Sequence, residues 1–127
     1  MSWQYDHTHF KCSDYEKTVT FFKENFGGKE VSRWEVNGMP IVTLDIGGLQ
    51  YNFSPRRANE TVDSRTDTVR YGVYHIALKT QNLEAEAAKM KQRGVKFAQD
   101  VKQLNPKTKT AFIEGPDGIS VELLQRD

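Results

Sequence analysis

The chain contains one segment twice, and this internal repeat is the strongest constraint on what it can fold into. The segment DHTHFKCSD at residues 6–14 has a counterpart, YHIALKTQN, at residues 74–82. In each copy a histidine opens an alternating segment, and an Asp or Asn then precedes an amphipathic run. A solenoid needs at least three repeats. Two copies, each filling about half of the 127 residues, therefore predict two fused copies of one supersecondary unit.

Periodicity and turn residues predict the order strand, helix, strand, strand, strand in the first half. The expected elements are a strand over 7–12, a helix capped by Ser13 or Asp14 and ended by Gly27-Gly28, and strands over 29–35, 41–46 and 49–53, with turns at Asn37-Gly38 and Gly47-Gly48. Pro55 is expected to end the last strand.

The second half predicts the same order. The expected elements are a strand over 74–80, a helix over 83–93 ended by Gly94, and strands over 95–98, 110–114 and 119–124, with a loop of uncertain form over 102–109 that contains Pro106. The polar segment 56–70 is expected to be a mobile surface linker. We therefore expect one α+β domain over 1–127 with two tandem βαβββ modules, about 1–55 and about 71–127.

Composition excludes several classes of function. With 18 basic and 17 acidic residues the net charge is +1, which does not favour nucleic acid or a membrane surface as the partner. No stretch has the length and apolarity of a signal peptide or a membrane span. The single cysteine, Cys12, cannot form an internal disulfide and suits a reducing compartment. A soluble cytoplasmic protein is expected.

Polar residues gather on one predicted sheet face. Alternation places apolar residues of the first and last strand of each half under a helix, and it leaves His7, His75 and Glu122 on the opposite face. Such residues also occur on a merely solvated sheet face. If the two halves pair by pseudo-twofold symmetry, however, two imidazoles and one carboxylate form the donor set of a divalent transition metal. The ligands alone do not distinguish Fe, Mn, Ni, Co and Zn.

The repeat, together with the ending GPDGISVEL at residues 115–123, resembles the vicinal oxygen chelate superfamily over essentially the whole chain. This superfamily includes glyoxalase I, extradiol dioxygenases, fosfomycin-resistance enzymes and bleomycin-binding proteins. The resemblance implies a glyoxalase-like half-barrel or barrel, a metal held by His7, His75 and Glu122, and a homodimer whose modules pair within one chain or between two.

The fourth strand departs from the glyoxalase I pattern, which commonly has a Glu there. Gln50 and Asn52 face the right way, and Gln50 would complete a His/Gln/His/Glu set as in methylmalonyl-CoA epimerase. Counting from Gly48 against Gly118 favours Asn52 instead. If neither amide binds the metal, the set matches extradiol dioxygenases and fosfomycin-resistance enzymes.

Other residues on this face are candidates for substrate contacts. His9, which has Ala77 as its counterpart in the repeat, is a candidate general base or a plain cavity-wall residue. Lys11 and Lys79 are candidates for binding an anionic group, although long basic side chains also lie at the rim of a barrel without any such role. Asn52 is a further candidate for substrate binding.

The resemblance implies that a substrate binds the metal through two adjacent oxygens while Glu122 shuttles a proton. Lyase or isomerase chemistry is slightly favoured. Extradiol-type dioxygenation and fosfomycin-resistance-like thiol transfer are the alternatives within the superfamily. The alternative of another class is a metal-free binding protein similar to the bleomycin-resistance members.

Overall fold

The computed structural model describes residues 2–127, which form two compact units. One unit ends at Ser64 and the other spans Arg65–Asp127. The boundary falls inside the polar segment between the two copies of the repeat. Each unit is described by itself below.

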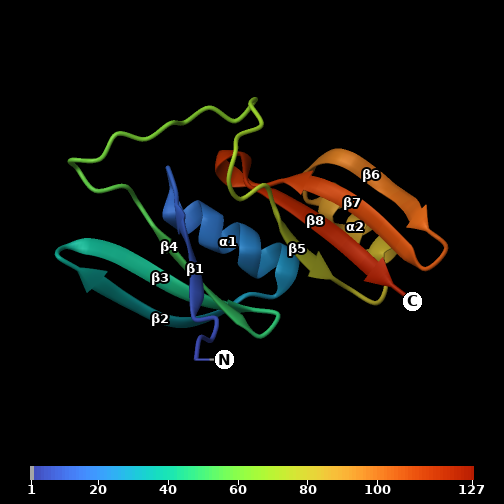
Figure 1. The fold of residues 1–127 in the computed structure, drawn as a ribbon, viewed down its shortest axis with the longest axis horizontal. Coiled ribbons are helices and arrows are strands. Elements are labelled where there is room, and N and C mark those ends of the chain that lie inside the picture. The colour runs from blue at the N-terminus through green and yellow to red at the C-terminus, as the bar shows by residue number, and fades with distance from the viewer. Residues whose placement is uncertain (1) are drawn as a thin grey trace. The chain divides into compact units, whose positions relative to one another are not determined.

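The first unit is a four-stranded sheet with one helix (Figure 1). Its elements are β1 (His7–Lys11), α1 (Tyr15–Phe26), β2 (Lys29–Val36), β3 (Met39–Ile46) and β4 (Leu49–Ser54). The strand order is β1-β4-β3-β2, in which β1 pairs in parallel with β4 and the other neighbours are antiparallel.

The second unit repeats this topology. Its elements are β5 (Ile76–Lys79), α2 (Leu83–Gln92), β6 (Lys96–Asn105), β7 (Thr108–Glu114), the short 3₁₀ helix η1 (Pro116–Gly118) and β8 (Ser120–Arg126). The strand order is β5-β8-β7-β6, and β5 pairs in parallel with β8. The predicted α+β fold of two βαβββ modules is therefore confirmed. Within residues 2–127, neither α-helix has the length and apolarity needed to cross a membrane.

The repeated Asp or Asn caps the helix of each unit. The Asp14 side chain accepts a hydrogen bond from the backbone N–H of Lys17 at 3.1 Å, and Asn82 accepts one from Ala85 at 3.1 Å. Each bond satisfies a backbone donor that the first helical turn leaves unpaired. Gly27 ends α1 in the left-handed conformation, with φ of 64°, as the expected glycine C-cap requires.

The core of each unit lies between its helix and its sheet. In the first unit the Phe10 ring stacks with those of Phe22 and Phe53, which contact each other in a tilted arrangement. Phe22 and Phe53 are fully buried. In the second unit the buried side chains are Leu83, Ala87, Met90, Ala111, Ile113, Val121 and Leu123. The faces that carry His9 and Glu122 are the opposite ones, because side chains alternate along a strand.

Several expected boundaries were wrong. Residues 102–105 continue β6 rather than forming a loop, and Pro106-Lys107 makes a tight turn into β7. The polar sequence misled the prediction because β6 is an edge strand whose residues from Lys102 to Asn105 are exposed, so it needs little apolar alternation. Similarly, β5 begins at Ile76, after His75 rather than before it.

Burial differs from the expectation at several positions of β4 and β8, although the predicted alternation of faces stands. Leu49, expected to pack under the helix, is 47% exposed because it lies at the turn after Gly48. Asn52 and Ser54, expected on an open face, are buried. Leu124, on the face of β8 opposite α2, is buried as well, so residues on these faces are not all exposed to solvent.

A charged cluster joins α1 to the edge strand of the first sheet. The Arg33 guanidinium donates two hydrogen bonds to the Glu16 carboxylate, at 2.7 and 2.9 Å, and its Nε donates to Glu30 at 2.8 Å. Lys23 also donates to Glu30, at 3.0 Å. The hydrogen bond from Arg33, followed by that from Lys23, lowers the pKa of Glu30 from 4.5 to about 2.

We predict that Arg33→Met raises the pKa of Glu30 by about one unit or more, because an adjacent opposite charge lowers a carboxyl pKa by roughly 1–3 units. Since the folded-state pKa is depressed, the stabilisation is present above the unfolded value and is lost as the pH falls through about 2. The variant should therefore lose stability at neutral pH, and the loss should shrink in strong acid. Side-chain NMR titration measures the pKa, with Arg126→Met as the control; an unchanged Glu30 titration would contradict the assignment.

Candidate functional site

The first unit carries two histidines on the sheet face opposite α1. In the parallel register of β1 and β4, His7 lies opposite Gln50 and His9 lies opposite Asn52. Gln50 is exposed, whereas Asn52 is 6% exposed. The four predicted site residues His7, His9, Gln50 and Asn52 are therefore neighbours on one face of the sheet.

His7 is oriented by its neighbour in the sequence. Its Nδ1 lies 2.6 Å from a carboxylate oxygen of Asp6. A carboxylate that accepts the Nδ1 proton leaves Nε2 with a free lone pair, which is the usual arrangement of a metal-binding histidine. His7 therefore has a defined tautomer and a free Nε2 lone pair.

His9 has a different environment from His7. Its Nε2 lies 2.7 Å from the Ser54 hydroxyl, which itself donates to the Pro55 carbonyl at 3.1 Å. Burial lowers the pKa of His9, and the positive charge of Lys11 lowers it further. The neutral imidazole therefore predominates at neutral pH, which is the form a general base requires.

The register decides which amide corresponds to Glu122. Ala77, the counterpart of His9 in the repeat, pairs with Glu122 in β8, just as His9 pairs with Asn52 in β4. Asn52 therefore occupies the position that Glu122 has in the second unit. Gln50 corresponds to Ser120 by the same comparison.

The two candidate lysines differ in their surroundings. Lys11 forms an ion pair with Glu60, and its ammonium lies 3.9 Å from the Met39 sulfur. The same Glu60 carboxylate accepts a hydrogen bond from the backbone N–H of Arg57. Lys79 is exposed at the end of β5. The positive charge of Lys11 is thus already balanced within the first unit.

In the second unit, His75 and Glu122 are in contact. His75 Nε2 lies 3.2 Å from Glu122 Oε1, and the other carboxylate oxygen accepts a hydrogen bond from the Thr110 hydroxyl at 2.9 Å. The His75 imidazole contacts two aromatic rings. Its centroid lies 4.9 Å from that of the Tyr74 ring and 5.2 Å from that of the Phe112 ring. Both side chains are partly buried, at 25% and 17% exposure.

This pair fits two adjacent ligands of one metal ion. Zinc-type bonds to nitrogen and oxygen of about 2.0–2.2 Å place neighbouring donor atoms about 3–3.5 Å apart. His75 Nδ1 is buried without a hydrogen-bond partner, so no carboxylate orients this histidine as Asp6 orients His7. Among residues 2–127 no three His, Cys, Asp or Glu side chains gather into a metal-sized group.

Several residues of these environments were missed by sequence reasoning. Asp6, Ser54, Thr110 and Phe112 contact the candidate ligands or His9. Asp6 adjoins His7 in the sequence, and Thr110 and Phe112 alternate on one face of β7, so a signal existed for each of these three. The Ser54 contact depends on the parallel register of β1 and β4, which no local pattern specifies.

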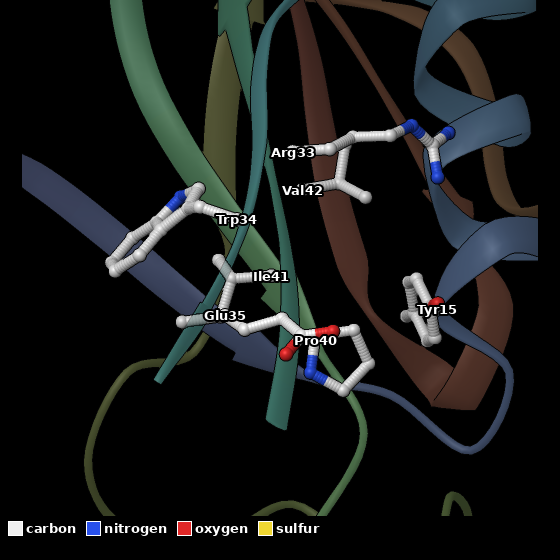
Figure 2. Close-up of a pocket in the computed structure, with 7 residues that line it drawn as sticks. All are labelled: Tyr15, Arg33, Trp34, Glu35, Pro40, Ile41 and Val42. Atoms are coloured by element: carbon white, nitrogen blue, oxygen red, sulfur yellow. The ribbon is translucent and has the colours of Figure 1, made fainter. Parts of the chain in front are cut away.

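A separate pocket of about 210 Å³ lies in the first unit (Figure 2). Its lining residues are Tyr15, Arg33, Trp34, Glu35, Pro40, Ile41 and Val42. None of the predicted site residues is among them. Figure 2 shows Trp34 pointing away from Tyr15 and from the Arg33 guanidinium.

Comparison with known proteins identifies the family. The sequence profile of the Glyoxalase/Bleomycin resistance protein/Dioxygenase superfamily matches residues 4–123. The chain belongs to this superfamily. It is 28% identical to the uncharacterized protein YwbC of Bacillus subtilis, over 99% of this chain and 100% of that protein. It is 25% identical to the lactoylglutathione lyase of Schizosaccharomyces pombe, over 98% of this chain but 48% of that protein, so it spans about half of the lyase.

Solved structures of this superfamily share the fold. A glyoxalase family protein from Bacillus cereus has a TM-score of 0.84 at 18% identity, covering 97% of this chain and 93% of that one. The fosfomycin resistance protein FosX from Listeria monocytogenes has a TM-score of 0.78 at 17% identity, covering 100% of this chain and 96% of that one. At such identities the likeness establishes the fold alone.

We predict that Thr110→Val weakens binding of a divalent metal about tenfold, because residues that orient a ligand typically contribute 10–100-fold in affinity. Thr110→Ser retains the hydroxyl and should bind nearly as well as the wild type. Calorimetric titration with Co²⁺ measures both variants. Equal affinities for Thr110→Val and the wild type would show that this hydrogen bond does not support a metal ligand.

Proposed function

We propose that the protein is a metal-dependent enzyme acting on a small substrate that offers two adjacent oxygens. The observation that carries the proposal is the pair of His75 Nε2 and Glu122 Oε1, 3.2 Å apart in the second unit. His7, with Nδ1 held by Asp6, is the nitrogen ligand from the first unit. Gln50, opposite His7 in the register, is the candidate fourth ligand.

Two neutral imidazoles and a carboxylate suit one divalent ion of Fe, Mn, Ni, Co or Zn at each site. When bound, such an ion supplies positive charge that stabilises the negative charge developing on the substrate oxygens. The protein residues then bind the substrate and move protons. Asn52 and the rim residues Lys11 and Lys79 are the proposed substrate contacts.

Lyase or isomerase chemistry is the reaction we favour. It requires a proton to leave one atom of the substrate and reach another, and Glu122 and His9 are the proposed carriers. His9 lies opposite Asn52, where the first unit lacks the carboxylate that the second unit has. The sequence similarity to a lactoylglutathione lyase across nearly the whole chain supports this choice.

One observation favours a second candidate. Because Asn52 replaces a carboxylate at the position equivalent to Glu122, the charged ligand set is two histidines and one glutamate. That set also serves thiol transfer to an epoxide and extradiol-type dioxygenation.

We predict that the wild type binds one divalent metal per chain and that His75→Ala and Glu122→Gln each reduce affinity at least a hundredfold. Gln50→Ala tests the fourth ligand, and Lys107→Met is a control outside both the ligand set and the proposed substrate contacts. Turnover is then assayed with the methylglyoxal–glutathione hemithioacetal, with fosfomycin plus a thiol, and with catechol under Fe²⁺ and oxygen.

The outcomes separate the candidates. Hemithioacetal turnover lost in both ligand variants supports the lyase, and turnover of only one of the other substrates selects that reaction instead. A wild-type protein that takes up no metal after reconstitution would contradict the proposal and favour a metal-free ligand-binding protein.

We also propose a homodimer. The segment before β5 exposes several apolar side chains, namely Val69, Tyr71, Val73 and Tyr74. A cluster of exposed apolar residues is typical of a protein interface. We predict two chains per particle by light scattering and a shift toward one chain in the Tyr71→Ser/Val73→Ser double variant. A wild-type monomer would contradict this proposal.

A further inference from the structure

A chain of three side chains on the first sheet controls the orientation of the Asn52 amide. The indole N–H of Trp34 donates to the Thr43 hydroxyl oxygen at 3.1 Å, and that hydroxyl donates to Asn52 Oδ1 at 2.6 Å. Thr43 and Asn52 are 5% and 6% exposed. Thr43 lies directly opposite Asn52 in the β3–β4 register, so strand pairing holds the two side chains side by side.

The direction of these hydrogen bonds follows from what each group can do. An indole nitrogen only donates, so the Thr43 oxygen must be the acceptor of that bond. The Thr43 hydroxyl has one proton, which in this buried position needs an acceptor. Asn52 Oδ1 is that acceptor. If the amide were turned around, its N–H would donate to the second lone pair of the Thr43 oxygen, and the buried hydroxyl proton would lose Oδ1 as its acceptor.

The NH₂ group of Asn52 is therefore turned away from Thr43 and remains a free donor, while Oδ1, held by the Thr43 hydroxyl, keeps only one lone pair. An amide nitrogen has no lone pair suited to a metal, whereas it donates well to a carbonyl or anionic oxygen. In the second unit the equivalent residue, Glu122, offers an oxygen ligand next to His75. The two units thus carry opposite hydrogen-bonding groups at matched positions.

We infer that Trp34 and Thr43 are positioning residues that make Asn52 a hydrogen-bond donor to an acceptor oxygen of the substrate rather than a metal ligand. This inference rests on the proposed function and narrows it. The substrate, or the anion formed from it, presents a carbonyl, enolate or other anionic oxygen to the first unit. A substrate group that can only donate hydrogen bonds would find no acceptor in the Asn52 NH₂ group.

The test uses the full chain loaded with Co²⁺ and oxalate as the probe, because oxalate binds metals through two adjacent oxygens and offers only acceptors. Calorimetry should show about tenfold weaker oxalate binding for Asn52→Ala and Thr43→Val, in line with the loss of one hydrogen bond to a charged acceptor. Thr43→Ser keeps the hydroxyl and should restore affinity to within about twofold. Trp34→Phe removes only the indole donor and should give an intermediate loss.

Metal binding supplies the second measurement. Asn52→Ala and Thr43→Val should keep one Co²⁺ per chain at near wild-type affinity, in contrast to His75→Ala. Loss of Co²⁺ from Asn52→Ala would show that the amide oxygen is a ligand and would overturn the inference. The inference would also be overturned if Thr43→Val bound oxalate as tightly as the wild type does. The same holds if Thr43→Ser bound oxalate as weakly as Thr43→Val does.

NMR of the metal-free protein tests the relay independently of the proposed function. The Thr43 hydroxyl proton should give a slowly exchanging signal with nuclear Overhauser effects to the Trp34 indole N–H, and this signal should be absent in Thr43→Val. If the wild type binds no Co²⁺, the proposed function fails and this spectrum alone decides the orientation. Close contact of the Asn52 amide protons with the Thr43 hydroxyl proton would contradict it.

Discussion

Parallel pairing between the first and last strands of each unit is the constraint on which the candidate site depends. It sets β1 against β4 and β5 against β8, although each pair is separated in sequence by a helix and two strands. Parallel strands require a crossover connection, and the capped helix of each unit lies in that connection. Because the register is fixed, His9 faces Asn52, and Glu122 lies within reach of His75. Which candidate side chains are neighbours therefore depends on backbone pairing more than on any local motif.

The two units keep one topology but differ in the groups that they carry. The helix caps Asp14 and Asn82 retain the same function, because either side chain accepts a backbone hydrogen bond. At matched positions of β8 and β4, the second unit has the Glu122 carboxylate, oriented by Thr110, and the first unit has the Asn52 amide, oriented by Thr43. The second unit therefore carries an anionic group at the position where the first unit carries a neutral amide.

The sequence predicted the βαβββ repeat well, because helix caps, glycine turns and alternating strands are local signals that tertiary packing did not override here. It failed at β6, where an exposed edge strand has no apolar alternation, and at Leu49, which a turn leaves in solvent. Counting from Gly48 against Gly118 pointed to Asn52 as the counterpart of Glu122, and the register makes the same match. The relay from Trp34 through Thr43 could not be predicted, because it needs the pairing of β2, β3 and β4 and a specific rotamer at each residue.

X-ray absorption spectroscopy of the Co²⁺-loaded protein counts the imidazole ligands of the bound metal and so tests whether His7 and His75 both bind it. Two imidazoles together with oxygen ligands are expected in the wild type, one imidazole in His7→Ala, and two in His9→Ala. A wild-type spectrum with a single imidazole, or one that changes in His9→Ala but not in His7→Ala, would contradict the proposed ligand set.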